Sequence, residues 1–473
     1  MTNLRISIVG AGSAVFSLRI ISDLCKMPKL SGTEVVLMDI NEERLENVLV
    51  LARELTEFFG ANLKFEKTLS LRKAIEGANF VINTALAGGH EYLNKVRTIG
   101  EKYGYYRGID AQNYNFVTDY LNLTNWNQMT LFLKIANLIK ELAPDAWYLQ
   151  AANPVLEGTT LVSTETGIKM VGFCHGHFSV ETLAEVVGAK DYKWQVAGVN
   201  HGIWLTKFES PDGKNLYEEL VKYADKPHKP STPFDDQLSP VAWDMYRTYG
   251  LFPIGDTVRN STWKYHRNLE TKKRWYGEPW GGADSELGWE WYVGQLNAVV
   301  SVIELFAKAV KNGQKLTKAK DEVIKAIPHV SEEWKTLIAD LLDPSKLSRE
   351  QHVPFIDSVV NGERRRFVVN VLNNGKIKGL DDDIAVEICA YVEGEKFEFE
   401  DVSLPKRILD WYLKPRTLLA KQALEIFKTK NLKLLEDILE RDPRTKSSEQ
   451  VRKVMDELYP LMLSEQKKVE QQE

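Results

Sequence analysis

A short stretch near the N-terminus, in which an apolar run is followed at once by two glycines, sets the tightest limit on the fold. Residues 4–20 read LRISIVGAGSAVFSLRI. Residues 6–9 are mostly apolar and β-branched, as expected of a strand that is buried on both faces, and Gly10 and Gly12 follow where this strand would end. The order of strand, glycine turn and helix predicts a dinucleotide-binding α/β unit.

The glycine turn is expected to bind the pyrophosphate of a dinucleotide. Gly10 would permit the tight turn, Gly12 would let the backbone approach the pyrophosphate, and Ser13 completes the predicted binding turn. Valine replaces the third glycine of the usual motif, so a glycine turn in some other α/β fold is the alternative. The predicted strand 34–38 ends in Asp39, whose carboxylate would bind ribose hydroxyls and repel a 2′-phosphate. We therefore predict NAD rather than NADP.

Length, charge and cysteine content bound the class of protein. The 473 residues, of which 44% are hydrophobic, suffice for two domains. No apolar run approaches a membrane span, and the first strand begins too early for a signal peptide to precede it. The three cysteines are widely spaced and odd in number, which argues against a disulfide framework. A net charge of −5 without a polybasic patch argues against nucleic acid. We expect a cytoplasmic protein that acts on small molecules.

The strand and helix pattern continues beyond the glycine turn, as in a doubly wound sheet. Asn83, in a predicted strand at 80–84, is expected to contact the cofactor. Asn153 follows a predicted strand at 146–149 and would contact ribose or substrate, unless it is only a turn residue before proline. Residues 85–114 are glycine-rich and aromatic without a sustained period, so we predict a long loop that acts as a lid.

The predicted fold is α/β with two domains. Residues 1–195 would form a Rossmann-type, doubly wound NAD-binding domain, and residues 196–473 a helix-rich mixed α/β domain that binds substrate and metal and packs against the first. The predicted elements of the second half are a strand pair and several helices, at 367–372 and 385–392, and at 296–310, 319–327, 333–342, 406–429, 432–441 and from 447 onward.

Two short motifs follow apolar, strand-like runs and end in side chains that bind metals. The first contains Cys174 and His175, in the sequence FCHGH, and the second contains His201, in VNHGIW. Each alone is explained by a small buried thiol or a turn histidine. Together they predict a metal site with Cys174 and His201 as ligands.

The segment 251–292 combines a polar turn with aromatic residues. Asp256, Arg259 and Asn260 lie in the turn sequence GDTVRN between apolar runs, which indicates a functional cluster. Five of the twelve tryptophans follow within this segment. Aromatic rings offer flat apolar surfaces to sugars, although a tryptophan-rich core is an equal alternative for most of the five. His352 lies in the second half and could reach the site, or occupy a surface turn.

These motifs, in this order, resemble those of glycoside hydrolase family 4. The resemblance rests on GAGS at 10–13, YYRGIDAQ at 105–112, ANP at 152–154, CHGH at 174–177 and VNHG at 199–202, and it extends over essentially the whole chain. The CHG element together with GDTVRNS is most similar to the α-glucosidase members. The resemblance implies NAD and a divalent metal, usually manganese. It assigns Cys174 and His201 as metal ligands and Asn153 as a substrate contact.

The resemblance also implies an unusual route of hydrolysis, which is an exception to the two-carboxylate scheme. NAD would take hydride from C3 of the sugar, and the resulting ketone would acidify the proton on C2. A base would remove that proton, the C1 group would leave, water would add, and the hydride would return to C3. A metal that bridges the C2 and C3 oxygens would stabilise the charge. Asp256 is the predicted base, and His175 or Asp119 the predicted acid.

The sequence leaves alternatives open for the sugar that is cleaved and for the class of protein. We predict an α-glucosidase, with an α-glucuronidase as the alternative in which Arg259 would face the C6 carboxylate. Arg259 and Asn260 are the predicted substrate contacts beside Asn153. A 2-hydroxy-acid dehydrogenase with His201 as its acid and base, or a non-catalytic sensor of NAD or sugar, would share parts of the pattern. The expected partners are a glycoside or oligosaccharide and further copies of the chain, in a homodimer or homotetramer.

Overall fold

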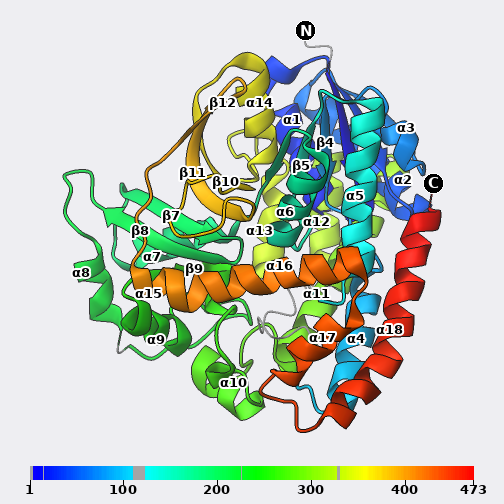
Figure 1. Cartoon of the computed structure of the whole chain (residues 1–473). Helices are drawn as coiled ribbons and strands as arrows, with labels where there is room; N and C mark the ends of the chain where they lie inside the picture. The colour runs from blue at the N-terminus through cyan, green and yellow to red at the C-terminus, as the bar shows by residue number, and fades with distance from the viewer. Residues whose placement is uncertain (1–3, 14, 110–122, 225, 327–330, 473) are drawn as a thin grey trace.

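The parallel half of the sheet follows the predicted order. The computed structural model describes residues 4–13, 15–109, 123–224, 226–326 and 331–472. Its first six strands pair in parallel in the order β3-β2-β1-β4-β5-β6 (Figure 1). They span Arg5–Val9 (β1), Glu34–Met38 (β2), Lys64–Thr68 (β3), Phe80–Asn83 (β4), Trp147–Gln150 (β5) and Met170–Gly172 (β6). The doubly wound, Rossmann-type arrangement predicted from the glycine turn is confirmed.

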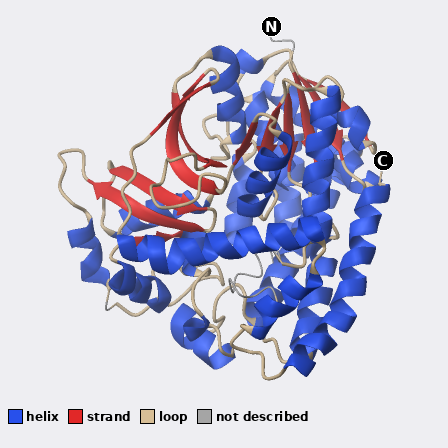
Figure 2. Ribbon diagram, in the orientation of Figure 1, coloured by secondary structure: helices blue, strands red, loops and turns tan. Residues whose placement is uncertain are grey.

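The second half extends the same sheet with antiparallel strands. The sheet continues in the order β6-β10-β11-β7-β8-β9, and β12 pairs with β11 at the side. Figure 2 shows these strands curving away from the parallel strands. They span Lys193–Val199 (β7), Gly202–Glu209 (β8), Phe252–Ile254 (β9), Arg365–Leu372 (β10), Ala385–Glu393 (β11) and Lys396–Phe399 (β12). The strand pair predicted at 367–372 and 385–392 is confirmed as β10 and β11, whereas the domain boundary at 195/196 stays a prediction.

Helices cover both faces of the parallel strands and most of the second half. In the first half they span Val15–Cys25 (α1), Glu42–Phe59 (α2), Leu71–Ile75 (α3), Gly89–Lys102 (α4), Trp126–Leu142 (α5), Val155–Thr166 (α6) and Ser179–Val186 (α7). In the second half they span Tyr217–Leu220 (α8), Pro240–Tyr249 (α9), Leu269–Tyr276 (α10), Glu286–Lys311 (α11), Leu316–Ala326 (α12), Glu332–Asp340 (α13), His352–Asn361 (α14), Lys406–Ile408 (α15), Lys414–Thr429 (α16), Leu432–Glu440 (α17) and Ser448–Gln471 (α18).

The prediction of one long loop at 85–114 is wrong at Gly89–Lys102, which form α4, and its last part, 110–114, lies outside the described residues. Tyr92, Leu93, Val96 and Gly100 form the buried face of this helix, at the spacing of an amphipathic helix. The helix packs against α18 from the far end of the chain. The helix that packs against α4 is thus remote in sequence. The glycine and aromatic residues of the segment obscured the helical spacing of its apolar residues.

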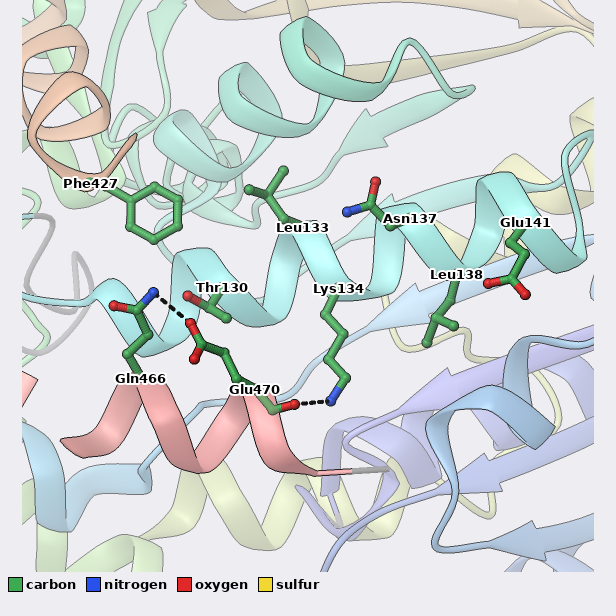
Figure 3. Close-up of a pocket in the computed structure, with 9 residues that line it drawn as sticks. All are labelled: Thr130, Leu133, Lys134, Asn137, Leu138, Glu141, Phe427, Gln466 and Glu470. Carbon is green, nitrogen blue, oxygen red and sulfur yellow. Dashed lines mark hydrogen bonds between the residues drawn. The ribbon is translucent and has the colours of Figure 1, made fainter. Parts of the chain in front are cut away.

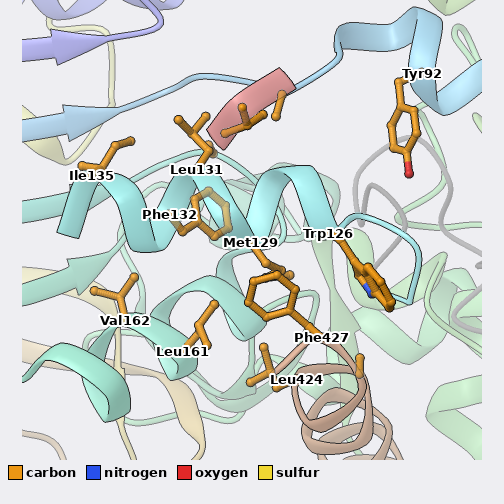
Figure 4. Close-up of a cluster of buried hydrophobic side chains, with 14 of the residues drawn as sticks. Tyr92, Trp126, Met129, Leu131, Phe132, Ile135, Leu161, Val162, Leu424 and Phe427 are labelled. Atoms are coloured by element: carbon orange, nitrogen blue, oxygen red, sulfur yellow. The ribbon is translucent and has the colours of Figure 1, made fainter. Parts of the chain in front are cut away.

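The C-terminal helices pack on the first half. Helix α18 lies along α5, and α16 crosses in front of α6 (Figure 1). Figure 4 shows Phe132 and Ile135 of α5, Leu161 and Val162 of α6, and Leu424 of α16 in one cluster of hydrophobic side chains. All of these side chains are buried. Chain ends that lie far apart in sequence therefore share one hydrophobic core.

Helix α11 is long and apolar enough to cross a membrane by length and composition alone. The sequence-based prediction that no apolar run approaches a span needs this correction. In the structure α11 packs against α2 and α12, and Val299, Val302, Ile303 and Phe306 lie in the core beside the sheet. Those contacts are the ones expected of a core helix.

A buried arginine ties the end of the chain to the loop that follows α4. The Arg444 guanidinium pairs with the buried Asp442 carboxylate and donates to the carbonyl oxygens of Tyr106 and Gly108, both at 2.7 Å. The side chain of Arg444 is 2% exposed. One cation therefore satisfies a carboxylate and two loop carbonyls in the interior.

We expect Arg444→Ala to lower the free energy of unfolding by about 3 kcal/mol, because it leaves the buried Asp442 charge unpaired. The measurement is urea denaturation followed by circular dichroism. Arg441→Ala is the matched control, since Arg441 pairs with Asp437 at the surface, and it should change stability by about 0.5 kcal/mol or less. Equal effects of the two substitutions would contradict this role for Arg444.

Candidate functional site

The glycine turn lies at the carboxyl end of β1, where a dinucleotide binds in this fold. Gly10 has φ +84°, and a Cβ there would lie 2.6 Å from the backbone of Ala85. The backbone N–H of Gly12 donates to the Asp39 carboxylate at 2.7 Å, and a Cβ on Gly12 would meet that carboxylate at the same distance. Only glycine fits at position 10, whereas a side chain at position 12 would displace the Asp39 carboxylate. Asp39 lies directly beside the turn, as predicted for the ribose-binding residue.

Of the other predicted cofactor residues, Ser13 is exposed at the end of the turn, while Asn83 is fully buried. The Asn83 amide donates to the Tyr148 hydroxyl at 2.8 Å, and its oxygen accepts from the Ala85 N–H at 3.1 Å. These bonds hold the end of β4 against its neighbours. Asn83 thus supports the nucleotide edge from inside the sheet, and its side chain is not presented to a ligand.

Asn153 follows β5 at the same edge of the sheet. Its side-chain oxygen is buried and has no hydrogen-bond partner among the described residues. A buried acceptor without a partner is costly, and a bound hydroxyl group would satisfy it. The position and the free acceptor agree with the predicted contact to ribose or substrate.

Cys174, His201 and Asp256 converge on one point. The potential ligand atoms of these three residues all lie within 4.8 Å of one another. Cys174 follows β6, His201 lies in the turn between β7 and β8, and Asp256 follows β9. The structure therefore brings together the two predicted metal ligands and adds a carboxylate as a third.

Close backbone approach explains how the two loops meet. A Cβ on Gly255 would lie 2.6 Å from the carbonyl oxygen of Gly176, and Gly255 has φ +59°. The loop after Cys174 thus rests directly on the loop that begins with Asp256. Any side chain at position 255 would push these loops apart and separate the ligands.

The turn that carries His201 is held from several sides. His201 has φ +54°, a backbone conformation that is uncommon outside glycine, and its carbonyl oxygen accepts from the Asn260 amide at 3.0 Å. The preceding Asn200 donates to the buried Glu387 carboxylate at 2.9 Å. Burial raises the pKa of Glu387, and the bond from Asn200 opposes that shift. Asn260, a predicted substrate contact, therefore uses its amide to position His201.

The Asp256 carboxylate has two partners besides a metal. It lies 3.2 Å from Nε2 of His201 and forms an ion pair with Arg259. Arg259 also pairs with Asp236 at 2.9 Å, and burial raises the pKa of Asp236 to about 6 although Arg259 lowers it. Asp256 was predicted as the base. Its place among the ligand atoms shows a further possible role as ligand, and the base role stays a prediction.

The remaining predicted residues differ in how they meet the site. His175 follows Cys174 and is exposed by its accessible area, and desolvation by the surrounding protein lowers its pKa. Asp119 lies outside the described residues. His352 is buried behind the site, with its ring 5.4 Å from that of Phe16 and 5.0 Å from that of Phe173. Burial lowers its pKa to about 4, so it packs as a neutral ring.

A groove on the described surface lies away from these residues. Figure 3 shows it between α5 and α18, with Phe427 at one end and Glu141 at the other. Its volume is about 500 Å³. Lys134 in the groove donates to the Val469 carbonyl at 3.0 Å and so caps the end of α18. None of the nine lining residues belongs to the predicted site.

Comparison with known proteins assigns the family. The family model "Family 4 glycosyl hydrolase" matches residues 5–189, and the model of that family's C-terminal domain matches residues 196–445. The fold and the Cys174 site thus define a nucleotide-binding glycosidase architecture. The chain belongs to family 4 of the glycosyl hydrolases, and the predicted resemblance is confirmed. The alternative that this chain is a 2-hydroxy-acid dehydrogenase is therefore not supported.

Relatives of this chain differ in the sugar they are named for. An alpha-galactosidase of Bacillus subtilis is 24% identical over 83% of this chain and 82% of its own length. An alpha-galacturonidase of Thermoanaerobacter italicus is 30% identical over 52% of this chain and 56% of its own length. A glycoside hydrolase is therefore established, whereas α-glucosidase specificity is not.

A solved neighbour shows the same fold. A 6-phospho-alpha-glucosidase from gut microorganisms, in complex with NAD and Mn²⁺, superposes with a TM-score of 0.74 at 15% identity, over 98% of this chain and 99% of the other. The predicted cofactors, NAD and manganese, are those bound in that neighbour. In the present chain the donor set of Cys174, His201 and Asp256 fits a divalent ion, and the Gly10 turn fits a dinucleotide.

We expect Gly10→Ala to abolish NAD binding, because the new Cβ would overlap the Ala85 backbone where the turn must close. Isothermal calorimetry with NAD is the measurement. Gly60→Ala is the control: Gly60 also has positive φ, at +61°, but a Cβ there meets nothing within 4 Å. That variant should bind NAD like the wild type, at a stability cost of about 1 kcal/mol. Retained NAD binding in Gly10→Ala would remove this turn from the cofactor site.

Asp256→Asn separates the ligand role from the base role. If the carboxylate binds the ion, manganese affinity should fall about tenfold or more, because a neutral amide replaces an anionic ligand. Manganese titration followed by electron paramagnetic resonance is the measurement. Asp244→Asn, at a more exposed carboxylate paired with Lys264, should leave affinity unchanged. Normal manganese affinity with lost turnover in Asp256→Asn would assign Asp256 as base only.

Proposed function

We propose that this protein is an NAD- and manganese-dependent α-glycosidase that cleaves α-glucosides. The observation that carries the proposal is the convergence of Cys174, His201 and Asp256 beside the carboxyl edge of the nucleotide-binding strands. A sugar placed between the two would have C3 within reach of a nicotinamide and its C2 and C3 hydroxyls within reach of the ion. Membership of a hydrolase family supports a glycosidic bond as the target.

When bound, NAD would supply reversible oxidation at C3, and the metal would polarise the neighbouring oxygens. The chain would do the rest. Cys174, His201 and Asp256 would hold and orient the ion, and Asn153 would offer an acceptor to a substrate or ribose hydroxyl. His175, which is exposed next to Cys174, is the candidate acid that would give a proton to the leaving group, with Asp119 as the other candidate.

The charge around Arg259 supports a neutral sugar over a uronate. The α-glucuronidase alternative relies on Arg259 to bind a C6 carboxylate. In the structure its guanidinium pairs with both Asp236 and Asp256 and lies over the ring of Phe234. Two carboxylates already exceed its single charge, so a third anion there would be repelled. This arrangement favours an uncharged glycoside.

An α-galactoside is the second candidate substrate. The α-galactosidase of Bacillus subtilis matches most of both chains. Glucosides and galactosides differ only in the direction of the C4 hydroxyl. A single hydrogen bond at the site would decide between them.

The test is release of p-nitrophenol from a panel of p-nitrophenyl glycosides, with and without NAD and manganese under reducing conditions. We expect turnover of the α-glucoside only when both are present, and little turnover of the glucuronide or the 6-phosphoglucoside. Preference for the galactoside would select the second candidate. Turnover that ignores NAD and manganese would overturn the proposal.

Isotope exchange tests the route. Hydrolysis in heavy water should place deuterium at C2 of the released sugar, because the C2 proton is removed and replaced in each turnover. Mass spectrometry of product at early turnover is the measurement, with free product incubated with enzyme as the control. An unlabelled product would exclude C2 deprotonation, since direct displacement leaves that bond intact.

A further inference from the structure

The five tryptophans of segment 251–292 divide into separate groups. Trp275 packs edge-on against Tyr265 at 4.8 Å, and Lys264 lies over its ring. Trp280 and Trp291 instead pack on each other, with ring centres 6.3 Å apart. One tryptophan of the five, Trp289, is buried, and the others are half-buried. A single sugar-binding face made of all five is therefore excluded, and the pair Trp280 and Trp291 needs its own explanation.

Phe234 connects this pair to the metal-binding carboxylate. Its ring centre lies 6.2 Å from that of Trp291, and the Arg259 guanidinium lies 5.0 Å from the Phe234 ring centre. Arg259 in turn pairs with Asp256. A continuous series of contacts thus leads from the metal site through Arg259 to three half-buried aromatic rings.

The same rings adjoin the nucleotide side of the site. Phe234 also packs against Tyr292, at 5.7 Å, and the Tyr292 hydroxyl lies 3.3 Å from Nε2 of His90. His90 opens α4 directly after the β4 loop, and that loop packs on Gly10. The aromatic rings therefore lie between the edge expected to hold the nicotinamide and the loop that carries Asp256.

We propose that Phe234, Trp280 and Trp291 form the subsite for the leaving group of the glycoside, and that this leaving group is a sugar or aryl ring that packs on their faces. The inference rests on the proposed glycosidase function. The reacting sugar must present hydroxyls to the ion and to the polar groups around it. Flat apolar rings suit the part of the substrate beyond the glycosidic oxygen, which makes no contact with the ion, and such contacts discriminate by ring size and apolar surface.

The experiment uses the enzyme loaded with NAD and manganese. Trp291→Leu and Trp280→Leu are compared with wild type on two α-glucosides of the same sugar, one with a p-nitrophenyl or glucosyl leaving group and one with a methyl leaving group. We expect kcat/KM for the ring-bearing substrate to fall roughly tenfold, and kcat/KM for the methyl glucoside to change less than twofold. Trp291→Phe, which keeps a ring, should recover most of the loss.

Two controls make the outcome decisive. Trp411→Leu, at a tryptophan 65% exposed beside α15, should change neither substrate. Turnover of the methyl glucoside by each variant shows that it is folded and loaded. An equal fall on both substrates, or no fall on either, would overturn the leaving-group subsite. Absence of any NAD-dependent turnover in wild type would instead overturn the proposed function.

Discussion

The site depends on the insertion of β10 and β11 between β6 and β7. These two strands come from late in the chain, yet they pair with strands that end at Cys174 and His201. Glycines stand at both junctions: Gly172 pairs with Asn370, and Gly198 pairs with Glu387. A Cβ on Gly172 would lie 2.9 Å from the Cβ of Asn370 in β10, and one on Gly198 would lie 2.0 Å from the Gly202 carbonyl oxygen in β8. Glycine at these two positions therefore lets β6 pack closely on β10, and β7 on β8, next to the loops that carry Cys174 and His201.

Electrostatics explain why a divalent cation suits this position. Asp256 and Asp236 flank one cation, Arg259, within a largely buried cluster, and a Cys174 thiolate would add another negative charge. The excess of negative charge in a low-dielectric interior is costly until a cation joins it. Arg259 holds the Asp256 carboxylate in place, and the ion completes the neutralisation. The cluster would therefore be neutralised by the metal and the arginine together.

The sequence predicted the parallel strands, the glycine turn and both side chains Cys174 and His201, because each follows a local apolar run in the sequence. It could not reveal that Asp256 joins them, since this depends on the contact of Gly255 with Gly176 across 79 residues of chain. Helix α4 was missed because its stabilising partner, α18, lies at the other end of the sequence. Asn83 was misplaced because a polar residue at a strand end looks the same whether it faces a ligand or its neighbouring strands.

The same buried side chains pack behind the nucleotide site and the candidate metal site. Helix α1 begins at the glycine turn, and its Phe16 packs against the ring of His352. The same His352 ring also packs against Phe173, which is next to Cys174. The Arg19 side chain of the same helix pairs with the buried Glu350 at 2.9 Å. The proposed transfer of hydride from C3 and back would need a fixed distance between the bound nucleotide and the ion throughout the cycle. Interior packing resists small displacements more than a loop does, so this packing would keep the two sites at a constant separation.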